Sequence, residues 1–161
     1  MTTQYDVKSA HATASGVLVN YRTRLKGAVV SANATAATRN TVFANNVALT
    51  GTYNIPGSTT CTVTIANHGL ANGDRVWLSF TSGTATSNVY TVTVTGTNAF
   101  TVTTASLTTS GNVTMYADIL CEADSYNPTA FNVLIPGEGI LATEGIYVGL
   151  VANVTATVFY G

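Results

Sequence analysis

Charged side chains are scarce in this chain of 161 residues. The sequence holds six Lys or Arg and seven Asp or Glu, or 8% of the residues, whereas soluble domains average about 25%. The net charge of −1 disfavours a nucleic-acid partner, because proteins that bind nucleic acid carry a basic patch. Free monomers rely on surface charge for solubility, so we expect partners to cover part of this surface.

Cysteines and long apolar runs are scarce as well. Cys61 and Cys121 are the two cysteines, and their spacing is not that of a metal site. Isolated cysteines on a β pattern usually behave as small buried hydrophobes, so we favour free thiols over a disulfide, and we expect no metal or other cofactor. No window approaches about 18 apolar residues, which predicts no transmembrane helix and no membrane partner. The N-terminal residues also lack the apolar stretch of a secretory signal peptide.

Catalytic patterns are few. His68 and Asp74 could be combined with one of many serines into a triad, but no Gly-x-Ser-x-Gly motif is present. We interpret His68 instead as a residue that closes a turn. Glu138 and Glu144 could be combined into a carboxylate pair, but separate acids on loops are the simpler interpretation. The sequence therefore predicts no enzyme and no catalytic residue.

Threonine and valine dominate the residues that are present. The chain holds 30 Thr and 19 Val, both of which favour strands because their branched side chains fit a pleated surface. We therefore expect an all-β protein.

The segment 58–113 is typical of a small module of its own. Cys61, Val63 and Ile65 alternate with threonines, which is the pattern of a half-buried strand, and turn-forming residues follow at 67–74. Short strands at regular spacing without a helical pattern predict a small five-stranded β-barrel. The predicted strands are 58–65, 75–80, 89–94, 100–102 and 113–116.

The flanking residues, 1–57 and 114–161, also favour strands. We predict that they form one domain of β-sandwich or barrel-like type, built from both ends of the chain. The module 58–113 would then be an insertion that projects outward, while the flanking domain binds the capsid or other partners.

Charge is divided between the two flanks. Residues 1–57 carry a net charge of +4 and residues 114–161 carry −5. Either the two segments pair within one domain, or a basic face of one copy meets an acidic face of the next.

One stretch resembles a known module. Asn67–Val76 resembles the HGL..GD.V signature of a small β module found in many tailed-phage virion proteins. In this resemblance His68, Gly69, Gly73 and Asp74 set tight turns before the next strand. A second stretch, 136–147, is similar to short structural proteins of marine podoviruses and siphoviruses, and the similarity includes residues 158–161 and 1–31.

The resemblance implies a non-enzymatic virion structural protein, with no catalytic or cofactor-binding residues to carry over. Small size, β content and sparse charge favour a capsid decoration, or cement, protein on the outer surface of the bacteriophage head. Its partners would be the major capsid protein and further copies of itself, as a homotrimer. The alternatives are a tail adaptor, nozzle accessory or short fibre protein, and then a carbohydrate- or receptor-binding module.

The charge division also suggests which residues form oligomer or capsid contacts. A trimer joins its copies head to tail through two different faces, which the basic and acidic segments could supply. The N-terminal residues 5–9 could form an arm that becomes ordered on a partner. The expected contact residues are Tyr5, Lys8, Arg22, Arg24, Lys26, Arg39, Glu138 and Glu144.

Overall fold

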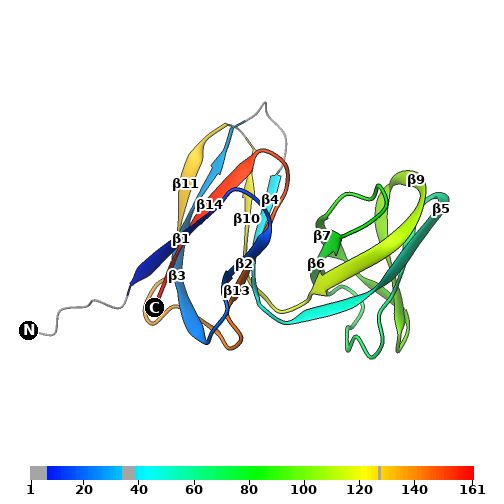
Figure 1. The fold of residues 1–161 in the computed structure, drawn as a ribbon, viewed down its shortest axis with the longest axis horizontal. Helices are drawn as coiled ribbons and strands as arrows, with labels where there is room; N and C mark the ends of the chain where they lie inside the picture. The colour runs from blue at the N-terminus through cyan, green and yellow to red at the C-terminus, as the bar shows by residue number, and fades with distance from the viewer. Residues whose placement is uncertain (1–6, 34–38, 127) are drawn as a thin grey trace, which may run out of the picture. The chain divides into compact units, whose positions relative to one another are not determined.

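The computed structural model describes residues 7–33, 39–126 and 128–161. The chain divides into two compact units, which we call the flanking unit (Met1–Asn46 with Leu120–Gly161) and the inserted unit (Val47–Ile119). The described residues form fourteen strands and no helix (Figure 1), which confirms the all-β expectation. Accordingly, no described helix could cross a membrane.

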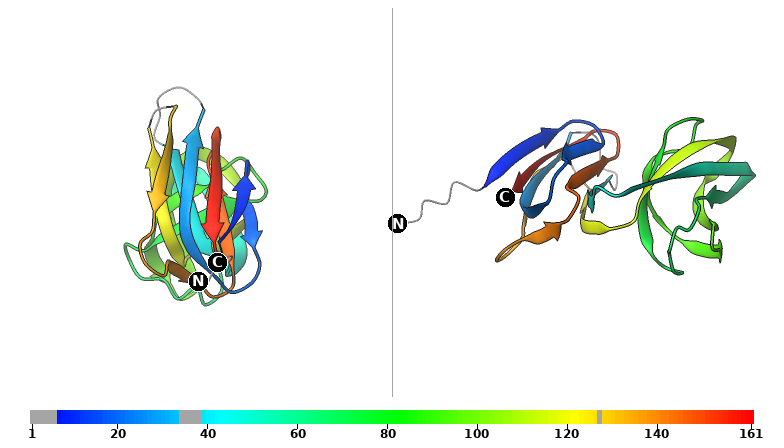
Figure 2. Two further views of the ribbon diagram at one scale, coloured as in Figure 1. Left: turned by 90° about the vertical axis from the view of Figure 1, so that its left-hand side faces the viewer. Right: turned by 60° about the horizontal axis from the view of Figure 1, so that its bottom comes forward.

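The flanking unit consists of two sheets. Sheet A has the order β1 (Lys8–Ala12), β14 (Val154–Tyr160), β3 (Thr23–Ala32) and β11 (Ala130–Leu134), and β12 (Ile140–Ala142) also pairs with β3. Sheet B has the order β10 (Ile119–Ser125), β4 (Arg39–Asn45), β13 (Ile146–Leu150) and β2 (Gly16–Val19). The four main strands of sheet A lie side by side in the left view of Figure 2.

Alternation along the strands builds the core of the flanking unit. In β14, Val154, Ala156 and Val158 are buried, while the residues between them remain partly exposed. Buried residues from both sheets, such as Val30 and Ile146, join one apolar cluster. This is the arrangement of a sandwich whose two sheets cover each other's inner faces, so the expected sandwich from both chain ends is confirmed.

The two oppositely charged flanks interleave within this sandwich. β14 lies between β1 and β3, and β13 lies between β2 and β4. Strands from the basic start of the chain therefore pair directly with strands from its acidic end. The charge division thus accompanies pairing within one unit, which is the first of the two interpretations.

The inserted unit contains one sheet of five strands. They are β5 (Ala48–Thr64), β6 (Arg75–Phe80), β7 (Asn88–Thr91), β8 (Thr93–Gly96) and β9 (Ala99–Tyr116). The order is β5-β9-β6-β7, with β8 paired to β9. The number of strands is as expected, but the sheet is not a closed barrel. Its apolar residues form a separate core that includes Phe100, Val63 and Met115.

The strands β5 and β9 are much longer than the sequence predicted. They pair from Ala48 opposite Tyr116 to Thr64 opposite Ala99, so the predicted strands 100–102 and 113–116 belong to one strand. The division between the units falls at 46/47 and 119/120, whereas the sequence placed it at 57/58 and 113/114. Residues 48–57 and 103–112 are rich in Thr, Ser, Gly and Asn, and their strand character depends on pairing with each other.

Gly51 permits a close approach within β5. A Cβ atom at this position would overlap the carbonyl oxygen of Thr64 and would lie 2.6 Å from Cγ1 of Ile65. Because Gly51 and Thr64 belong to the same strand, β5 bends back until its beginning meets its end. Glycine is the residue that allows two backbones to approach so closely.

The two thiols are free, as the sequence suggested. Cys61 is fully buried in the inserted unit and Cys121 is half-buried in the flanking unit. Burial raises the pKa of the Cys61 thiol to about 11, and burial followed by the charge of Cys61 raises the pKa of Tyr90 to about 12. Both groups are therefore held in their neutral forms.

We expect the inserted unit to lose stability as the pH rises from about 9 to about 11. The pKa of Cys61 rises from 9.0 to about 11 on folding. The buried neutral thiol therefore contributes its full share of the folding stability below pH 9, and that share is lost as the pH rises through the pKa of the folded state. Thermal unfolding between pH 7 and pH 10.5 measures this effect. Cys61→Ala should lower the melting temperature at pH 7, and its melting temperature should fall less than that of the wild type between pH 9 and pH 10.5. An equal fall in both proteins would contradict the role of the Cys61 thiol.

Candidate interaction surface

One face of sheet A carries no charged side chain over three consecutive rows. Residues opposite each other in neighbouring strands point to the same side of a sheet, so the registers define the rows. They are Ser9–Phe159–Gly27–Leu134, His11–Thr157–Val29–Asn132 and Thr155–Ser31–Ala130. The opposite side of each strand faces the core. We call these three rows the outer face of sheet A.

A hollow of about 380 Å³ opens on this outer face. Gly27 has no side chain, and its neighbours in the row, Phe159 and Leu134, line the hollow together with Val7 and Lys26. Leu134 is 87% exposed, more than the other large exposed hydrophobic residues of the described chain. The hollow could therefore bind an apolar side chain, and Lys26 adds one positive charge to its lining.

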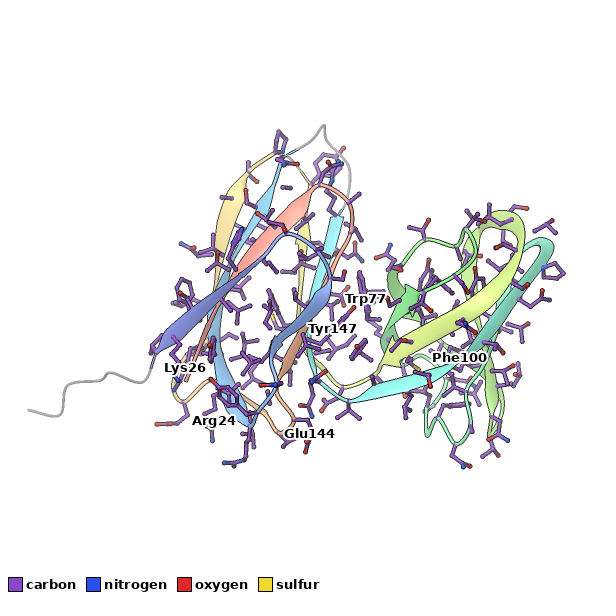
Figure 3. The ribbon with its side chains drawn as sticks, in the orientation of Figure 1. Arg24, Lys26, Trp77, Phe100, Glu144 and Tyr147 are labelled. Carbon is purple, nitrogen blue, oxygen red and sulfur yellow. The ribbon has the colours of Figure 1, made fainter. Side chains whose placement is uncertain are left out.

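Four of the predicted contact residues belong to one end of the flanking unit. Figure 3 shows Arg24, Lys26 and Glu144 at this end. Nη1 of Arg24 donates to the carbonyl oxygen of Gly139 at 3.1 Å. Glu138 precedes Gly139 in the loop between β11 and β12 and is exposed. Glu144 is exposed in the turn between β12 and β13. Basic and acidic candidates are thus mixed at one end of the unit.

Two further basic candidates border an aromatic corner. Nζ of Lys8 lies 5.9 Å from the ring centroid of Tyr21, and the Tyr21 and Tyr160 rings meet edge to face at 6.5 Å. With Arg22, these residues line a second hollow of about 230 Å³. A side-chain hydrogen bond with Tyr21 is the main factor that raises the pKa of Tyr160.

The other two candidates do not contribute to this surface. Arg39 is buried at the start of β4, and its carbonyl oxygen accepts a hydrogen bond from Oγ of Ser125 at 3.5 Å. Tyr5 lies outside the described residues. Lys8 and Ser9, which the sequence placed in an arm, pair with β14 as part of β1.

His68 closes a turn in the inserted unit. Leu70 N–H donates to Nδ1 of His68 at 3.1 Å, and Nε2 lies 2.9 Å from the carbonyl oxygen of Gly96. Because Nδ1 accepts, Nε2 carries the proton and donates to Gly96. The ring also packs edge to face on Phe100 at 5.2 Å between centroids. Both ring nitrogens are therefore engaged by the backbone, and neither is left for a serine.

Asp74 and the two signature glycines complete this loop. Oδ2 of Asp74 accepts a hydrogen bond from Ala71 N–H at 2.8 Å. Gly69 and Gly73 have φ values of +68° and +91°, the left-handed region that favours glycine. The four signature residues thus lie in a loop that backbone hydrogen bonds and left-handed glycines shape. Within the described residues, no group of three or more His, Cys, Asp or Glu gathers to hold a metal.

Two asparagines that the sequence pattern did not single out, Asn72 and Asn98, hold the loop in place. Oδ1 of Asn72 accepts from Val94 N–H at 2.6 Å, and Oδ1 of Asn98 accepts from Asn67 N–H at 2.8 Å. These bonds connect the loop to β8 and to the turn before β9. Asparagines in turn-rich segments commonly bond to the backbone, but the sequence does not reveal partners more than 20 residues away.

We expect His68→Ala to destabilise the inserted unit by about 2 kcal/mol. The change leaves backbone groups of Leu70 and Gly96 without their partner and removes the ring from Phe100, and an unsatisfied buried polar group costs about 1–3 kcal/mol. Urea unfolding followed by the fluorescence of Trp77, which lies in β6, measures this loss. The matched control is His11→Ala in the flanking unit, where the exposed ring bonds to Thr157 Oγ1 at 2.9 Å, and its unfolding is followed by circular dichroism. A loss as small as that of the control would contradict the structural role of His68.

Comparisons with known proteins match solved structures but no family. No family model and no curated protein matches the sequence. Among solved structures, the Phage phi92 endosialidase matches 83% of this chain at 23% identity, with a TM-score of 0.35. The chain spans 21% of the length of that protein. At this TM-score the likeness assigns neither an activity nor a shared architecture.

Proposed function

We propose that this chain is a non-enzymatic structural protein of a tailed-phage virion, which binds the outer surface of the head as an oligomer. The observation that carries the proposal is the uncharged outer face of sheet A. In a chain with 8% charged residues, a broad face without charge is suited to being covered by another protein. The resemblance of Asn67–Val76 to a virion module supplies the class of protein.

The mechanism of such a protein is cementing by mass action. A protein that binds the assembled shell and not its free subunits stabilises the shell. The outer face of sheet A would lie against the major capsid protein, with the hollow beside Leu134 receiving an apolar side chain. The charged residues at the end of the unit, including Arg24 and Glu144, would set orientation more than affinity. The inserted unit would project outward.

The test is the copy number of this chain in purified virions, measured by quantitative mass spectrometry against the major capsid protein. A ratio fixed by icosahedral positions is the expected result. About a dozen copies or fewer would overturn decoration in favour of a tail adaptor, nozzle accessory or fibre, since a tail offers one symmetric ring rather than a lattice.

A matched pair of variants tests the surface itself. Thr157→Lys places a charge in the middle row of the outer face and should reduce the amount of the chain on the head severalfold. Thr62→Lys, at an exposed threonine of the inserted unit, should leave that amount unchanged. Equal amounts of both variants on the head would contradict the role of sheet A.

A further inference from the structure

The strand β11 is an edge strand of sheet A without the usual protection against pairing with another chain. An exposed edge strand offers unpaired backbone groups to other chains, and proteins usually protect it with charge, proline or a bulge. β11 (Ala130–Leu134) has no charged residue and no proline, and it pairs with β3 without a register shift. Its other side has no partner strand among the described residues.

The other edges of the flanking unit are protected by charge, shortness or a bulge, although the protection of β1 is a single lysine at its first residue, which a partner with an acid at the matching position would neutralise. β1 carries Lys8, and β10 carries Glu122 and Asp124. β2 has four residues, and its pairing with β13 contains a bulge. β12, which pairs with β3 beside β11, has three residues. Among the longer described edges of this unit, β11 is therefore the one that lacks protection, which indicates that another strand covers it in the assembled protein.

The opposite edge of the same sheet fits β11 in length and direction. β1 has five residues, as β11 has. Three successive antiparallel pairings separate the two strands within one copy, so β1 and β11 run in opposite directions. β11 of one copy placed beside β1 of the next would continue the antiparallel sheet.

The side chains also fit this pairing. Phe131 and Val133 point to the core side of β11, where their partial exposure leaves apolar surface at the edge. Ala10 and Ala12 point to the core side of β1. Small residues opposite large ones allow the inner layers of two copies to join without overlap.

Charge distinguishes this head-to-tail pairing from a two-fold pairing of β11 with itself. In an antiparallel arrangement the end of β11, followed by the acidic Glu138, meets the start of β1, which carries Lys8. Both side chains are exposed. A two-fold β11 pair would instead place Glu138 beside the uncharged residues 128–130 of its partner. Charge complementarity therefore favours β1 as the occupant.

We propose that copies of this chain associate head to tail, with β11 of one copy pairing with β1 of the next. Head-to-tail contacts form a ring where the rotation closes, and three of them would make the trimer expected from the sequence. This inference deepens the oligomer that the proposed function includes. It is tested on purified protein, without the virion.

A charge-reversal cycle in the full chain tests the pairing. Sedimentation velocity of the wild type should show a discrete oligomer, and Lys8→Glu or Glu138→Lys should each weaken association about five- to tenfold. The double variant, with both charges exchanged, should return to within about twofold of the wild type. Asp124→Lys, at an exposed acid of β10 in sheet B, is the control and should leave association unchanged. Single variants without effect would overturn the proposal, as would a wild type that is monomeric at roughly 100 μM.

Disulfide trapping tests the strand order directly. A mixture of Ser9→Cys protein with Asn132→Cys or Leu134→Cys protein should form crosslinked dimers that neither variant forms alone. Crosslinking of Asn132→Cys protein by itself would indicate the two-fold β11 pair and would overturn the proposal. Because all three positions are exposed, circular dichroism should confirm unchanged folding. Wild-type protein under the same oxidation gives the background from Cys61 and Cys121.

The two proposals fail in distinguishable ways. Protein that is monomeric in solution and yet abundant on heads would overturn the strand pairing and leave decoration standing. Protein that associates through Lys8 and Glu138 but is absent from heads would overturn decoration alone.

Discussion

Gly51→Ala should abolish the cooperative unfolding of the inserted unit while the flanking unit still folds. The new Cβ would overlap the carbonyl oxygen of Thr64, a backbone atom within the same strand. Because β5 cannot yield there without opening its pairing with β9, we expect a loss of at least about 3 kcal/mol. The two units have separate apolar cores, so the damage should be confined to one of them.

Trp77 fluorescence during urea unfolding reports on the inserted unit, and circular dichroism reports on both. The control is Gly96→Ala in the same unit, where a Cβ would meet no atom within 4 Å. It should change stability by less than about 0.5 kcal/mol. Similar unfolding curves for the two variants would show that β5 does not bend as sharply as described.

Replacing residues 47–118 by a single glycine should leave a flanking unit that folds by itself. β4 ends at Asn45 and β10 begins at Ile119, and these strands are neighbours in sheet B. The bond from Ser125 Oγ to the Arg39 carbonyl joins the end of β10 to the start of β4, so the strands run in opposite directions. Asn46 followed by glycine would then form a two-residue hairpin loop.

A second deletion, which joins Gly57 directly to Thr114, should instead aggregate. It follows the boundaries that the sequence suggested, but it removes most of β9 and leaves half of β5 without a partner. Tyr53 and Ile55 would lose the core that buries them. Thermal unfolding should show a cooperative transition for the first deletion and none for the second. A cooperative transition in the second would favour the boundaries at 57/58 and 113/114.

The sequence predicted the fold class and most of the strand positions well. The segments 58–65 and Arg75–Phe80 marked real strands, because the first alternates buried and exposed residues and the second holds a short apolar run that is buried on both faces. The beginning of β5 and the middle of β9 escaped detection. In the middle of β9, threonines and serines alternate between exposed and half-exposed positions, so no contrast between apolar and polar residues marks the strand. At the beginning of β5, Tyr53 and Ile55 are buried, but Gly51, Pro56 and Gly57 interrupt the pattern and are typical of turns. Pairing of distant segments makes them strands, and a single sequence does not display it.

The candidate surface was harder to predict than the fold. Sequence reasoning selected charged residues, since charge is visible in a chain that has little of it. The structure instead draws attention to an uncharged face, whose rows combine residues as distant as Ser9 and Leu134. Arg39 illustrates the difficulty, because its type suggests exposure while its place in β4 buries it. His68 and Asp74 lie in a segment of turn-forming residues, and each has a partner within three residues along the chain, Leu70 for His68 and Ala71 for Asp74.

The pairing of β1 with β14 has a mechanical consequence. Lys8 lies opposite Tyr160, so force applied across the two ends of the described chain pulls at one end of a single ladder. Its hydrogen bonds then break one after another rather than all together, which is the weak direction of a β-sheet. The inserted unit, spliced between β4 and β10, carries no tension until the flanking unit has opened. A load on the ends would therefore unzip the flanking unit first and leave the inserted unit folded.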